Sequence, residues 1–220
     1  MLIVNCLNIA EIDSDIYSLL RDSASQERRT RADKFYHLDD SKRCICSEHL
    51  LRHSLFESTG HCGAIDIRLN QYGKPYVQSV DGFFYNISHC GLWVILGYGE
   101  TEIGVDVERI REDNSGIAER FFTPSERTYI DIPDEAERGR RFMQLWTLKE
   151  SYIKYLGTGL STGLNTFSIN VPDGTVTDYN GKYTKDLRLK SMLFDNDYYL
   201  SSCSTDNDII VRTKGLSELL

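Results

Sequence analysis

Two carboxylates in the segment Gly104 to Glu108 have a spacing that suits metal binding. The order Gly-Val-Asp-Val-Glu is typical of a strand, where alternate residues share a face, so Asp106 and Glu108 face away from the two valines. Carboxylate oxygens are the hard donors that Mg²⁺ prefers, and two on one strand face can share the ion. The alternative is an exposed polar face of an edge strand, because acidic side chains are seldom fully buried. The spacing alone leaves both interpretations open.

A second group of residues recurs at every fourth position of a helical segment. Trp146, Glu150 and Lys154 would stack on one helix face. Glu150 could be a third metal ligand or a general base and Lys154 a phosphate contact, since Mg²⁺ usually joins carboxylates with phosphate oxygens of a substrate. The simpler alternative is a Glu–Lys pair worth about 0.2–0.5 kcal/mol beside a core tryptophan. Spacing does not separate the two.

Ser88 and His89 lie at the end of another predicted strand. Adjacent strand residues point to opposite faces, so these two cannot form a nucleophile and base directly, and no Gly-x-Ser-x-Gly elbow surrounds the serine. A serine hydrolase is therefore disfavoured. The hydroxyl and the imidazole can instead contact a phosphate, and the alternative is a polar strand end with its hydrogen bonds satisfied.

Positive charge is concentrated in one stretch of an acidic chain. The 220 residues include 25 Lys and Arg against 33 Asp and Glu, a formal net charge of -8. This balance excludes bulk electrostatic attraction to nucleic acid or to an anionic membrane, so an anionic ligand needs a local cluster. Arg28 and Arg31 can present two guanidinium forks to one phosphate, although a solvated helix face is the commoner explanation. The cluster comprises Arg28, Arg29, Arg31 and Lys34, followed by Lys42 and Arg43.

The elements that must position these residues occur in blocks. Helical patterns occupy about 16–20, 25–36 and 40–58, then 115–122 and 137–156, and Thr123-Pro124-Ser125-Glu126 has the form of a capping box. Apolar and β-branched runs predict strands near 2–7, 65–69, 83–88, 92–98, 103–108, 166–171, 187–194, 198–204 and 209–214.

The order strand, helices, strands occurs twice along the chain. This repetition predicts an α+β fold of two similar lobes rather than alternating α/β. We expect residues 1–102 to form the first lobe and residues 103–200 the second, with residues 201–220 as a strand and tail packed back on the lobes.

Cysteine usage and the N-terminal segment indicate the compartment. Six scattered cysteines without a Cys-x-x-Cys unit are typical of reduced thiols, and the sequence lacks a signal peptide and any apolar run of about 18 residues. We therefore expect a cytoplasmic protein. Cys46, His49 and His53 would share a helix face and could hold zinc, but a fourth ligand is not evident, and imidazoles on a helix face more often bind no metal.

Taken in order, these segments resemble the 4′-phosphopantetheinyl transferases of the larger Sfp type, which acts on peptide and polyketide synthetases. The resemblance implies an enzyme that transfers the phosphopantetheine arm of coenzyme A to a serine hydroxyl of an acyl or peptidyl carrier protein and releases adenosine 3′,5′-bisphosphate. It also implies a monomer with coenzyme A in the cleft between two similar lobes. The resemblance spans nearly the whole chain and rests on Lys34–His37, Tyr72–Pro75, Asn86–His89, Gly104–Glu108, Arg120–Phe122 with Glu126, and Trp146–Lys154.

The resemblance also implies roles in the second lobe. Asp106, Glu108 and Glu150 would hold Mg²⁺, with Mn²⁺ as another possible ion, and Glu150 would take the serine proton directly or through a metal-bound water. The catalytic set is then Glu150, Lys154 and Asp106. Trp146 would pack to fix the helix.

The coenzyme A contacts come mostly from the first lobe by the same resemblance. Arginines stand at positions 28 and 31, where lysines are common in the family, and Cys44 stands where a threonine often helps hold the 3′-phosphate. Glu126 is explained by its capping box without a catalytic role. The 3′-phosphate would be met by Arg28, Arg31 and His89, the other phosphates by Ser88, His89 and Lys154, and the adenine by Tyr72, Gly73 and Lys74.

Two alternatives remain beside this prediction: a Mg²⁺-dependent phosphohydrolase that uses the same carboxylates with water, and a coenzyme A-binding module without activity. All three acids are present, which disfavours the inactive module. The carrier protein, of fatty acid or nonribosomal peptide synthesis, is expected to contact the segment from Ile110 to Phe122, with Arg109, Arg111 and Arg120 as complementary charges.

Overall fold

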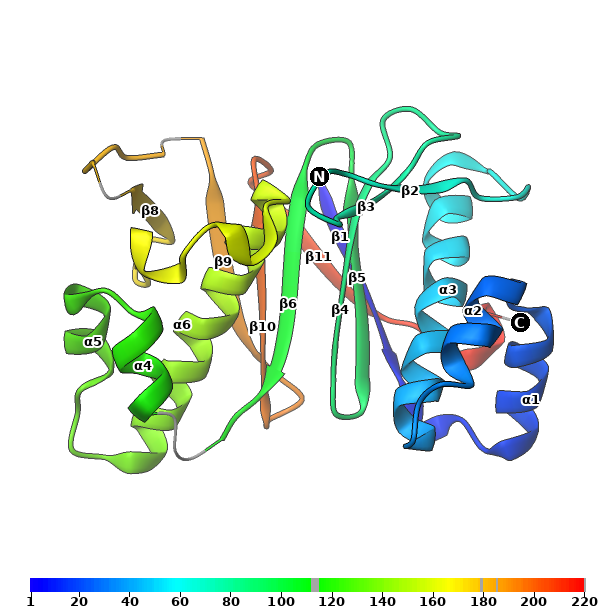
Figure 1. Ribbon diagram of the computed structural model, residues 1–220, viewed down its shortest axis with the longest axis horizontal. Coiled ribbons are helices and arrows are strands. Elements are labelled where there is room, and N and C mark those ends of the chain that lie inside the picture. Colours follow the sequence, from blue (N-terminus) through cyan, green and yellow to red (C-terminus); the bar gives the residue numbers. More distant parts are fainter. Residues whose placement is uncertain (112–114, 179, 185, 220) are drawn as a thin grey trace.

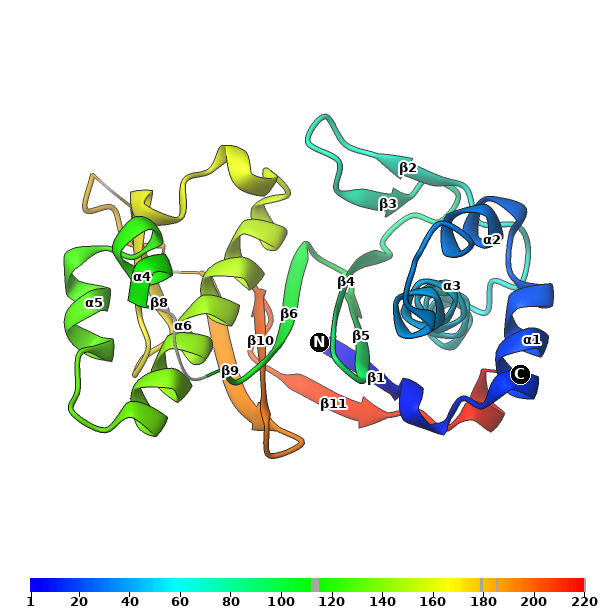
Figure 2. The ribbon, with the colours of Figure 1, turned by 60° about the horizontal axis from the view of Figure 1, so that its bottom comes forward.

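The computed structural model describes residues 1–111, 115–178, 180–184 and 186–219. Two sheets lie side by side in the middle of the molecule, and helices lie at both outer ends (Figure 1). The turned view in Figure 2 has the same order, so the layers are helix, sheet, sheet and helix. Among the described residues, no helix is long and apolar enough to cross a membrane.

The first lobe contains β1 (Leu2–Asn8), α1 (Ser14–Ser23), α2 (Gln26–Ala32), α3 (Leu38–Thr59), β2 (Ile67–Leu69), β3 (Pro75–Val77), β4 (Phe84–Cys90) and β5 (Trp93–Gly99). A further strand from the end of the chain, β11 (Ile209–Thr213), joins its main sheet, which has the order β11-β1-β5-β4. β5 pairs antiparallel with both β1 and β4, whereas β11 pairs parallel with β1. β2 and β3 form a separate small hairpin.

The second lobe contains β6 (Ile103–Arg109), α4 (Ser115–Phe121), α5 (Pro124–Ile130), α6 (Glu135–Leu156), β7 (Phe167–Asn170), β8 (Thr175–Asp178), β9 (Arg188–Phe194) and β10 (Tyr198–Ser204). Its main sheet has the order β6-β10-β9, with antiparallel pairing throughout. β7 and β8 form a separate hairpin. Short 3₁₀ turns lie at Ile9–Glu11, Gly159–Ser161, Leu164–Thr166 and Leu216–Glu218.

The two lobes repeat one plan. β1, α3, the β2–β3 hairpin, β4 and β5 correspond in order and pairing to β6, α6, the β7–β8 hairpin, β9 and β10. Both long helices have 22 residues and end at a glycine with positive φ, Gly60 at 71° and Gly157 at 64°. Glycine adopts this left-handed conformation without a Cβ clash, which explains both helix ends. The predicted α+β fold of two similar lobes is confirmed.

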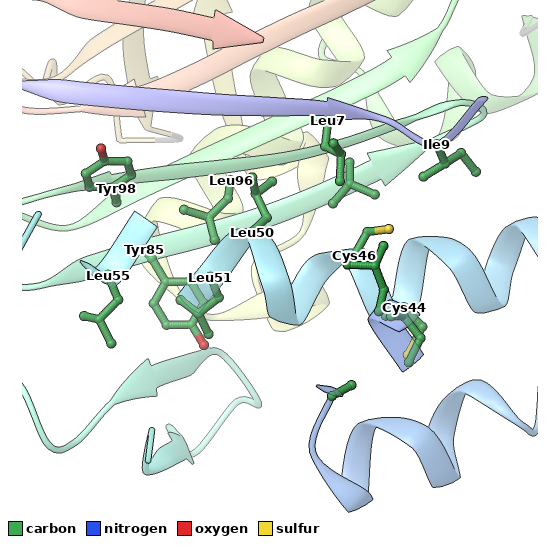
Figure 3. Packing of buried hydrophobic residues seen from close by; sticks show 14 of the residues in the cluster. Leu7, Ile9, Cys44, Cys46, Leu50, Leu51, Leu55, Tyr85, Leu96 and Tyr98 are labelled. Atoms are coloured by element: carbon green, nitrogen blue, oxygen red, sulfur yellow. The ribbon is translucent and has the colours of Figure 1, made fainter. Parts of the chain in front are cut away.

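Three apolar clusters hold the layers together. The first lies between α3 and its sheet, where Leu50 and Leu51 of the helix pack near Leu7 and Leu96 of the strands (Figure 3). The second lies around α6 in the other lobe. The third joins β1 and β5 of one sheet with β6 and β10 of the other, through residues such as Val105, and so fixes the two lobes face to face.

Most predicted elements match, with differences at short ones. The predicted helices at 40–58 and 137–156 are α3 and α6. The helix predicted at 16–20 is shorter than α1, and the strand predicted at 65–69 is longer than β2, which is exposed. β3 and β8 were not predicted. The helix start expected at Thr123 and Pro124 is confirmed as the start of α5, but the end of this helix at Ile130, separate from α6, was not predicted. β6 begins at Ile103, where we expected the second lobe to begin, and the expected boundary at residue 200 lies inside β10. The exact division of the chain into lobes stays a prediction.

Candidate active site

Side chains of β4 join the first lobe to the backbone of β6 in the second. The two strands belong to different sheets, and Asn86 Oδ1 accepts a hydrogen bond of 2.9 Å from the amide of Val105. One step along, Ser88 Oγ accepts from the amide of Val107 at 3.4 Å. Asn86 and Ser88 are buried. Candidate site residues of the two lobes therefore meet at this junction.

Asp106 lies at the centre of the junction. Ser88 Oγ donates to Asp106 Oδ1 at 2.7 Å, and Lys154 Nζ donates to the same oxygen at 2.6 Å and to Ser88 Oγ at 2.9 Å. Asp106 is 3% exposed, so the exposed polar edge considered for this strand is wrong at this position. Its second oxygen, Oδ2, is buried without a hydrogen-bond partner in the described part of the chain. An unpartnered buried carboxylate oxygen is costly, and it marks a place for a ligand or ion.

Gly104 allows α6 to bring Lys154 to Asp106. A Cβ atom at this position would lie 1.9 Å from the carbonyl oxygen of Ser151 and 2.4 Å from the amide nitrogen of Tyr155. Only a residue without a side chain permits this approach of helix to strand. The glycine of the Gly-Val-Asp-Val-Glu segment thus sets the distance between the two candidate catalytic elements.

Glu108 and Glu150 lie beside Asp106 from β6 and α6. Burial raises the pKa of Glu150, and the negative charges of Asp106 and Glu108 raise it further. Burial also raises the pKa of Glu108, next to Asp106 and with the thiol of Cys90 as a hydrogen-bond donor. Mutual repulsion of this kind arises when carboxylates converge. The three predicted acids are therefore near neighbours, and a nearby cation would relieve their repulsion.

The acids do not form a complete metal cage. Within the described residues, no group of three or more His, Cys, Asp and Glu side chains is arranged to hold an ion. Magnesium sites that act on phosphates commonly take one or two carboxylates from the protein and the remaining ligands from water and substrate. The unpartnered Oδ2 of Asp106 and the neighbouring glutamates fit such an open site.

His89 lies on the opposite side of β4 from Ser88, as the strand alternation predicts. Ser88 is buried and His89 is exposed. Partial desolvation lowers the pKa of the His89 imidazole, and the positive charges of Arg43 and Lys154 lower it further. Arg43 itself donates to the carbonyl of Gly91 and to Asp40 Oδ1, the latter at 2.6 Å. The structure thus brings Ser88, but not His89, into hydrogen-bond contact with Asp106 and Lys154.

The arginine cluster of α2 divides into inward and outward residues. Arg28 Nε lies 3.6 Å from Glu48 Oε2, and Arg28 Nη1 lies 4.0 Å from the sulfur of Cys44. Arg31 is exposed. Arg28 also lies within electrostatic range of Tyr85, which lines the pocket described next. Cys44 therefore stands next to the guanidinium with which it was expected to share a phosphate.

A pocket of 320 Å³ lies under the Tyr72–Lys74 turn. Lys74 lines it, together with β3, the start of β4 and Glu102. Gly73 has φ 92°, which the turn requires, while Tyr72 is 51% exposed. The ammonium group of Lys74 does not point to open space, since it contacts Glu102 Oε2 at 2.5 Å. Of the three residues expected to line the adenine, only Lys74 is among the residues that line this pocket, and its ammonium group is engaged in an ion pair. The adenine contact of this turn stays a prediction.

A buried ion pair between α5 and α6 was not predicted from the sequence. Lys149 Nζ lies 2.5 Å from Glu126 Oε1 and donates to the carbonyl of Phe167 at 2.9 Å, and both charged side chains are at most 1% exposed. Glu126 also accepts from the amides of Thr123 at 2.8 Å and Ile169 at 2.9 Å. The expectation that Glu126 is structural agrees with these contacts. Burial lowers the pKa of Lys149 to about 8, against the opposing charge of Glu126.

The three residues considered for a zinc site are Cys46, His49 and His53, and they lie in different surroundings. The thiol of Cys46 is buried in the core, and burial raises its pKa to about 12. His49 Nε2 lies 2.8 Å from the carbonyl of Leu20, and His53 Nε2 lies 3.7 Å from Glu57 Oε2. All six cysteines lie in the described part of the chain and are free thiols. Within the described residues no group of three His, Cys, Asp or Glu side chains is arranged to hold a metal, so the zinc site that the sequence already disfavoured is not supported. His53 Nε2 is buried without a hydrogen-bond partner in this part of the chain.

Comparison with known families agrees with this geometry. Residues 102–203 match the family described as the 4′-phosphopantetheinyl transferase superfamily, and residues 13–100 match the N-terminal family of 4′-phosphopantetheinyl transferases. The chain therefore belongs to the 4′-phosphopantetheinyl transferase family, and the resemblance found in the sequence is confirmed. It is an enzyme of the type that transfers phosphopantetheine from coenzyme A to carrier proteins.

Individual relatives cover most of the chain. A 4′-phosphopantetheinyl transferase of Bacillus subtilis is 31% identical over 202 residues, 90% of each chain. The 4′-phosphopantetheinyl transferase Sfp of Bacillus subtilis (strain 168) is 33% identical over 187 residues, 84% of this chain and 83% of the relative. The 4′-phosphopantetheinyl transferase psf-1 of Bacillus pumilus is 36% identical over 162 residues, 72% of this chain and 69% of the relative.

Proposed function

We propose that this transferase works with Mg²⁺, or with Mn²⁺, at the junction of the two lobes. The observation that carries the proposal is the buried Asp106, whose Oδ2 has no hydrogen-bond partner in the described part of the chain. Asp106, Glu108 and Glu150 would hold the ion with pyrophosphate oxygens of coenzyme A. When bound, the ion supplies positive charge to the pyrophosphate and orients it.

The second lobe supplies the groups that act on the reacting atoms. The serine oxygen of the carrier forms a bond to the phosphorus next to pantetheine, and the bond from that phosphorus to the bridging oxygen breaks, which releases adenosine 3′,5′-bisphosphate. Glu150 takes the serine proton, directly or through water, and its raised pKa brings it closer to the range useful for a base. Lys154 donates to a phosphate oxygen of the ligand in exchange for one of its present acceptors, which are Ser88 Oγ at 2.9 Å, the carbonyl of Val105 at 3.2 Å and Asp106 Oδ1 at 2.6 Å. Ser88 donates its only hydroxyl proton to Asp106, so it donates to phosphate only when that bond is exchanged.

The first lobe holds the nucleotide end in this proposal. The 320 Å³ pocket under the Tyr72–Lys74 turn is the adenine site. Arg28 and Arg31 meet the 3′-phosphate, with His89 at the adjoining strand. Glu48 lies 3.6 Å from Arg28 and holds its side chain ready for the ligand. Cys44, 4.0 Å from the same guanidinium, offers only a weak donor where the family often has a hydroxyl.

The carrier protein approaches from the side of Arg109. A depression of about 700 Å³ there is lined by Cys90, Arg109, Arg111 and Arg140, and the thiol of Cys90 is hydrogen-bonded to Glu108. Carrier proteins with acidic recognition surfaces would complement these arginines. In the expected contact segment, Arg120 lies over the ring of Phe121, while residues 112–114 lie outside the described residues. We propose that the enzyme works as a monomer in the cytoplasm, where its free thiols would stay reduced.

Intact mass spectrometry of an apo carrier protein tests the proposal. The carrier is incubated with the enzyme, coenzyme A and Mg²⁺, and we expect the mass increment of phosphopantetheine, which EDTA abolishes and added Mn²⁺ restores. Release of free phosphopantetheine without carrier modification would favour the phosphohydrolase, and coenzyme A binding without either product would favour the inactive module. Transfer that continues at full rate in EDTA would contradict the metal assignment.

A further inference from the structure

The turn before β3 is closed by one asparagine that also reaches the other lobe. Asn70 Oδ1 accepts hydrogen bonds from the amides of Tyr72 and Lys74, each at 2.9 Å, and the backbone of Asn70 and Lys74 pairs at 2.9 Å. Asn70 Nδ2 donates to the carbonyl of Gly157 at 2.9 Å. Gly157 is the residue at which α6 ends. The turn of the first lobe is thus attached to the end of α6 in the second.

Lys74 makes a second attachment at the same place. Its ammonium group contacts Glu102 Oε2 at 2.5 Å, the carbonyl of Ile103 at 3.0 Å and the carbonyl of Tyr155 at 3.3 Å. An ammonium group has three N–H donors, so all three are used. The side chain is 12% exposed. A ligand phosphate could accept from this ammonium group only by displacing the carboxylate or one of the two carbonyls.

The stem of Lys74 also packs on the end of α6. A Cβ atom at Gly157 would lie 2.9 Å from Lys74 Cδ and 3.0 Å from Asn70 Nδ2, so the glycine makes room for both side chains. Tyr155, whose carbonyl accepts from Lys74, directly follows Lys154 on α6. The same lysine lines the 320 Å³ pocket. One side chain therefore links the pocket wall to the helix that carries Glu150 and Lys154.

We propose that Lys74 is a positioning residue, which holds the pocket under its turn at a fixed spacing from α6, and that its charge is not a phosphate contact. The inference rests on the proposed function of that pocket and of α6. With the link intact, a nucleotide in the pocket and the groups of α6 keep one geometry. Without it, Asn70 alone attaches the turn to the end of α6, the spacing between them is less fixed, and both binding and turnover suffer.

The variant Glu102→Gln distinguishes a linking role of Lys74 from a phosphate contact, because the two roles predict opposite changes in the affinity for coenzyme A. If Lys74 binds phosphate, removal of the competing carboxylate frees its charge and coenzyme A binds more tightly. If Lys74 is a link, the weaker pair loosens the turn, and the dissociation constant of coenzyme A, measured by calorimetry, rises by about threefold to tenfold. Glu100→Gln, an exposed acid on the same connection between the lobes, is the matched control and should leave binding unchanged.

Steady-state kinetics give a second, independent readout. Lys74→Met keeps the stem and removes the charge, and we expect it to raise KM for coenzyme A and to lower kcat, each by about tenfold. The double variant Lys74→Met with Glu102→Gln should be no worse than Lys74→Met alone, since both changes break the same contact. A rise in KM with unchanged kcat, tighter coenzyme A binding in Glu102→Gln, or unchanged binding in that variant would each overturn the proposal.

Hydrogen exchange of the free enzyme tests the link without any ligand. In Lys74→Met, and to a smaller extent in Glu102→Gln, the amides of residues 70–74 and 155–157 should exchange about tenfold faster together, while those of β1 stay protected. This result would support the link even if the enzyme failed to transfer phosphopantetheine, so failure of the proposed function remains distinguishable. Unchanged exchange at both segments would overturn the link.

Discussion

Ser88 of the first lobe and Asp106 of the second share a hydrogen bond of 2.7 Å, from Ser88 Oγ to Asp106 Oδ1. The same hydroxyl accepts from Lys154 Nζ at 2.9 Å, so one serine orients two of the groups that we place at the reacting phosphates. Because Ser88 also accepts from the amide of Val107, it joins the two lobes at the place where the chemistry is expected. The hydroxyl of Ser88 therefore contributes both to the attachment of the lobes and to the alignment that we propose for Asp106 and Lys154.

Ser88→Ala should impair transfer more than it impairs folding. Loss of the hydroxyl removes the hydrogen bonds to Asp106 and Lys154, and we expect kcat/KM for coenzyme A to fall by about tenfold to a hundredfold, with about 1 kcal/mol less stability. Ser191→Ala is the matched control, because Ser191 Oγ is buried without a hydrogen-bond partner among the described residues. Equal transfer rates in the two variants would contradict the role given to Ser88.

The buried pair of Lys149 and Glu126 predicts a large loss of stability when one partner is removed. Lys149→Met leaves the Glu126 carboxylate buried without its counter-charge, and we expect the free energy of unfolding to fall by about 3–5 kcal/mol in urea titrations. The double variant Lys149→Met with Glu126→Gln should recover part of this loss. Lys182→Met, at an exposed lysine, serves as the control, and a loss no larger than in that control would refute the account of the pair.

Gly104→Ala should force α6 away from β6. The added methyl group would lie 1.9 Å from the carbonyl oxygen of Ser151, so helix and strand must separate. We expect a destabilisation of about 3 kcal/mol, measured by thermal or urea unfolding, and loss of transfer. Gly116→Ala in α4 meets no atom within 4 Å and should be neutral or slightly stabilising. A Gly104→Ala protein as stable and as active as Gly116→Ala would show that the close approach is not required.

The carboxylate of Glu57 should make the free energy of unfolding depend on pH in the acid range. Partial burial opposes its ionisation, but hydrogen bonds from Lys214, Asn5 and Tyr98 prevail and lower its pKa from 4.5 to about 2. A carboxyl group whose pKa is lower in the folded state stabilises above its unfolded value, and that contribution is lost as pH falls from about 4.5 to about 2. In Glu57→Gln, the free energy of unfolding should therefore change less with pH over this window than in the parent protein.

Two comparisons would test the Glu57 account. Glu11→Gln, at an exposed acid, should keep the parent pH dependence. Because Glu57 Oε1 lies 3.1 Å from Arg212 and 3.0 Å from Lys214, loss of the carboxylate should also loosen β11 on the first lobe. A pH profile of Glu57→Gln that overlays the parent profile between pH 2 and 4.5 would contradict the prediction.

Local patterns were enough to predict the elements that carry the acids. Alternation in Gly104–Glu108 placed Asp106 and Glu108 opposite the valines, and the fourfold spacing put Glu150 and Lys154 on one face of α6. Gly60 follows the predicted helix at 40–58 and ends α3, since only glycine readily takes its φ of 71°. Such features depend on neighbours in the chain, which a sequence displays directly.

Contacts between distant segments could not be derived in this way. The parallel pairing of β11 with β1 and the link from Lys74 to Tyr155 join residues far apart in the sequence. Lys149 follows an apolar residue in a helix, and nothing local distinguishes its burial beside Glu126 from a solvated position. Its partner Glu126 was identified in the sequence only as the acid of the capping box of α5. The ion pair of Lys74 with Glu102 could not be predicted either, because a lysine in a turn is ordinarily exposed.

Asp106→Asn gives the most direct test of the proposed active site. The substitution keeps the size of the side chain and an oxygen for the Ser88 hydrogen bond, but removes the charge that we assign to metal binding. With coenzyme A, Mg²⁺ and an apo carrier protein, intact mass spectrometry should record transfer slowed by about a thousandfold. Calorimetry should still detect a cooperative melting transition, which shows that the variant is folded although Lys154 has lost its counter-charge. A variant that modifies the carrier at near the parent rate would contradict the central claim that the junction of the two lobes, with Asp106 at its centre, performs the transfer.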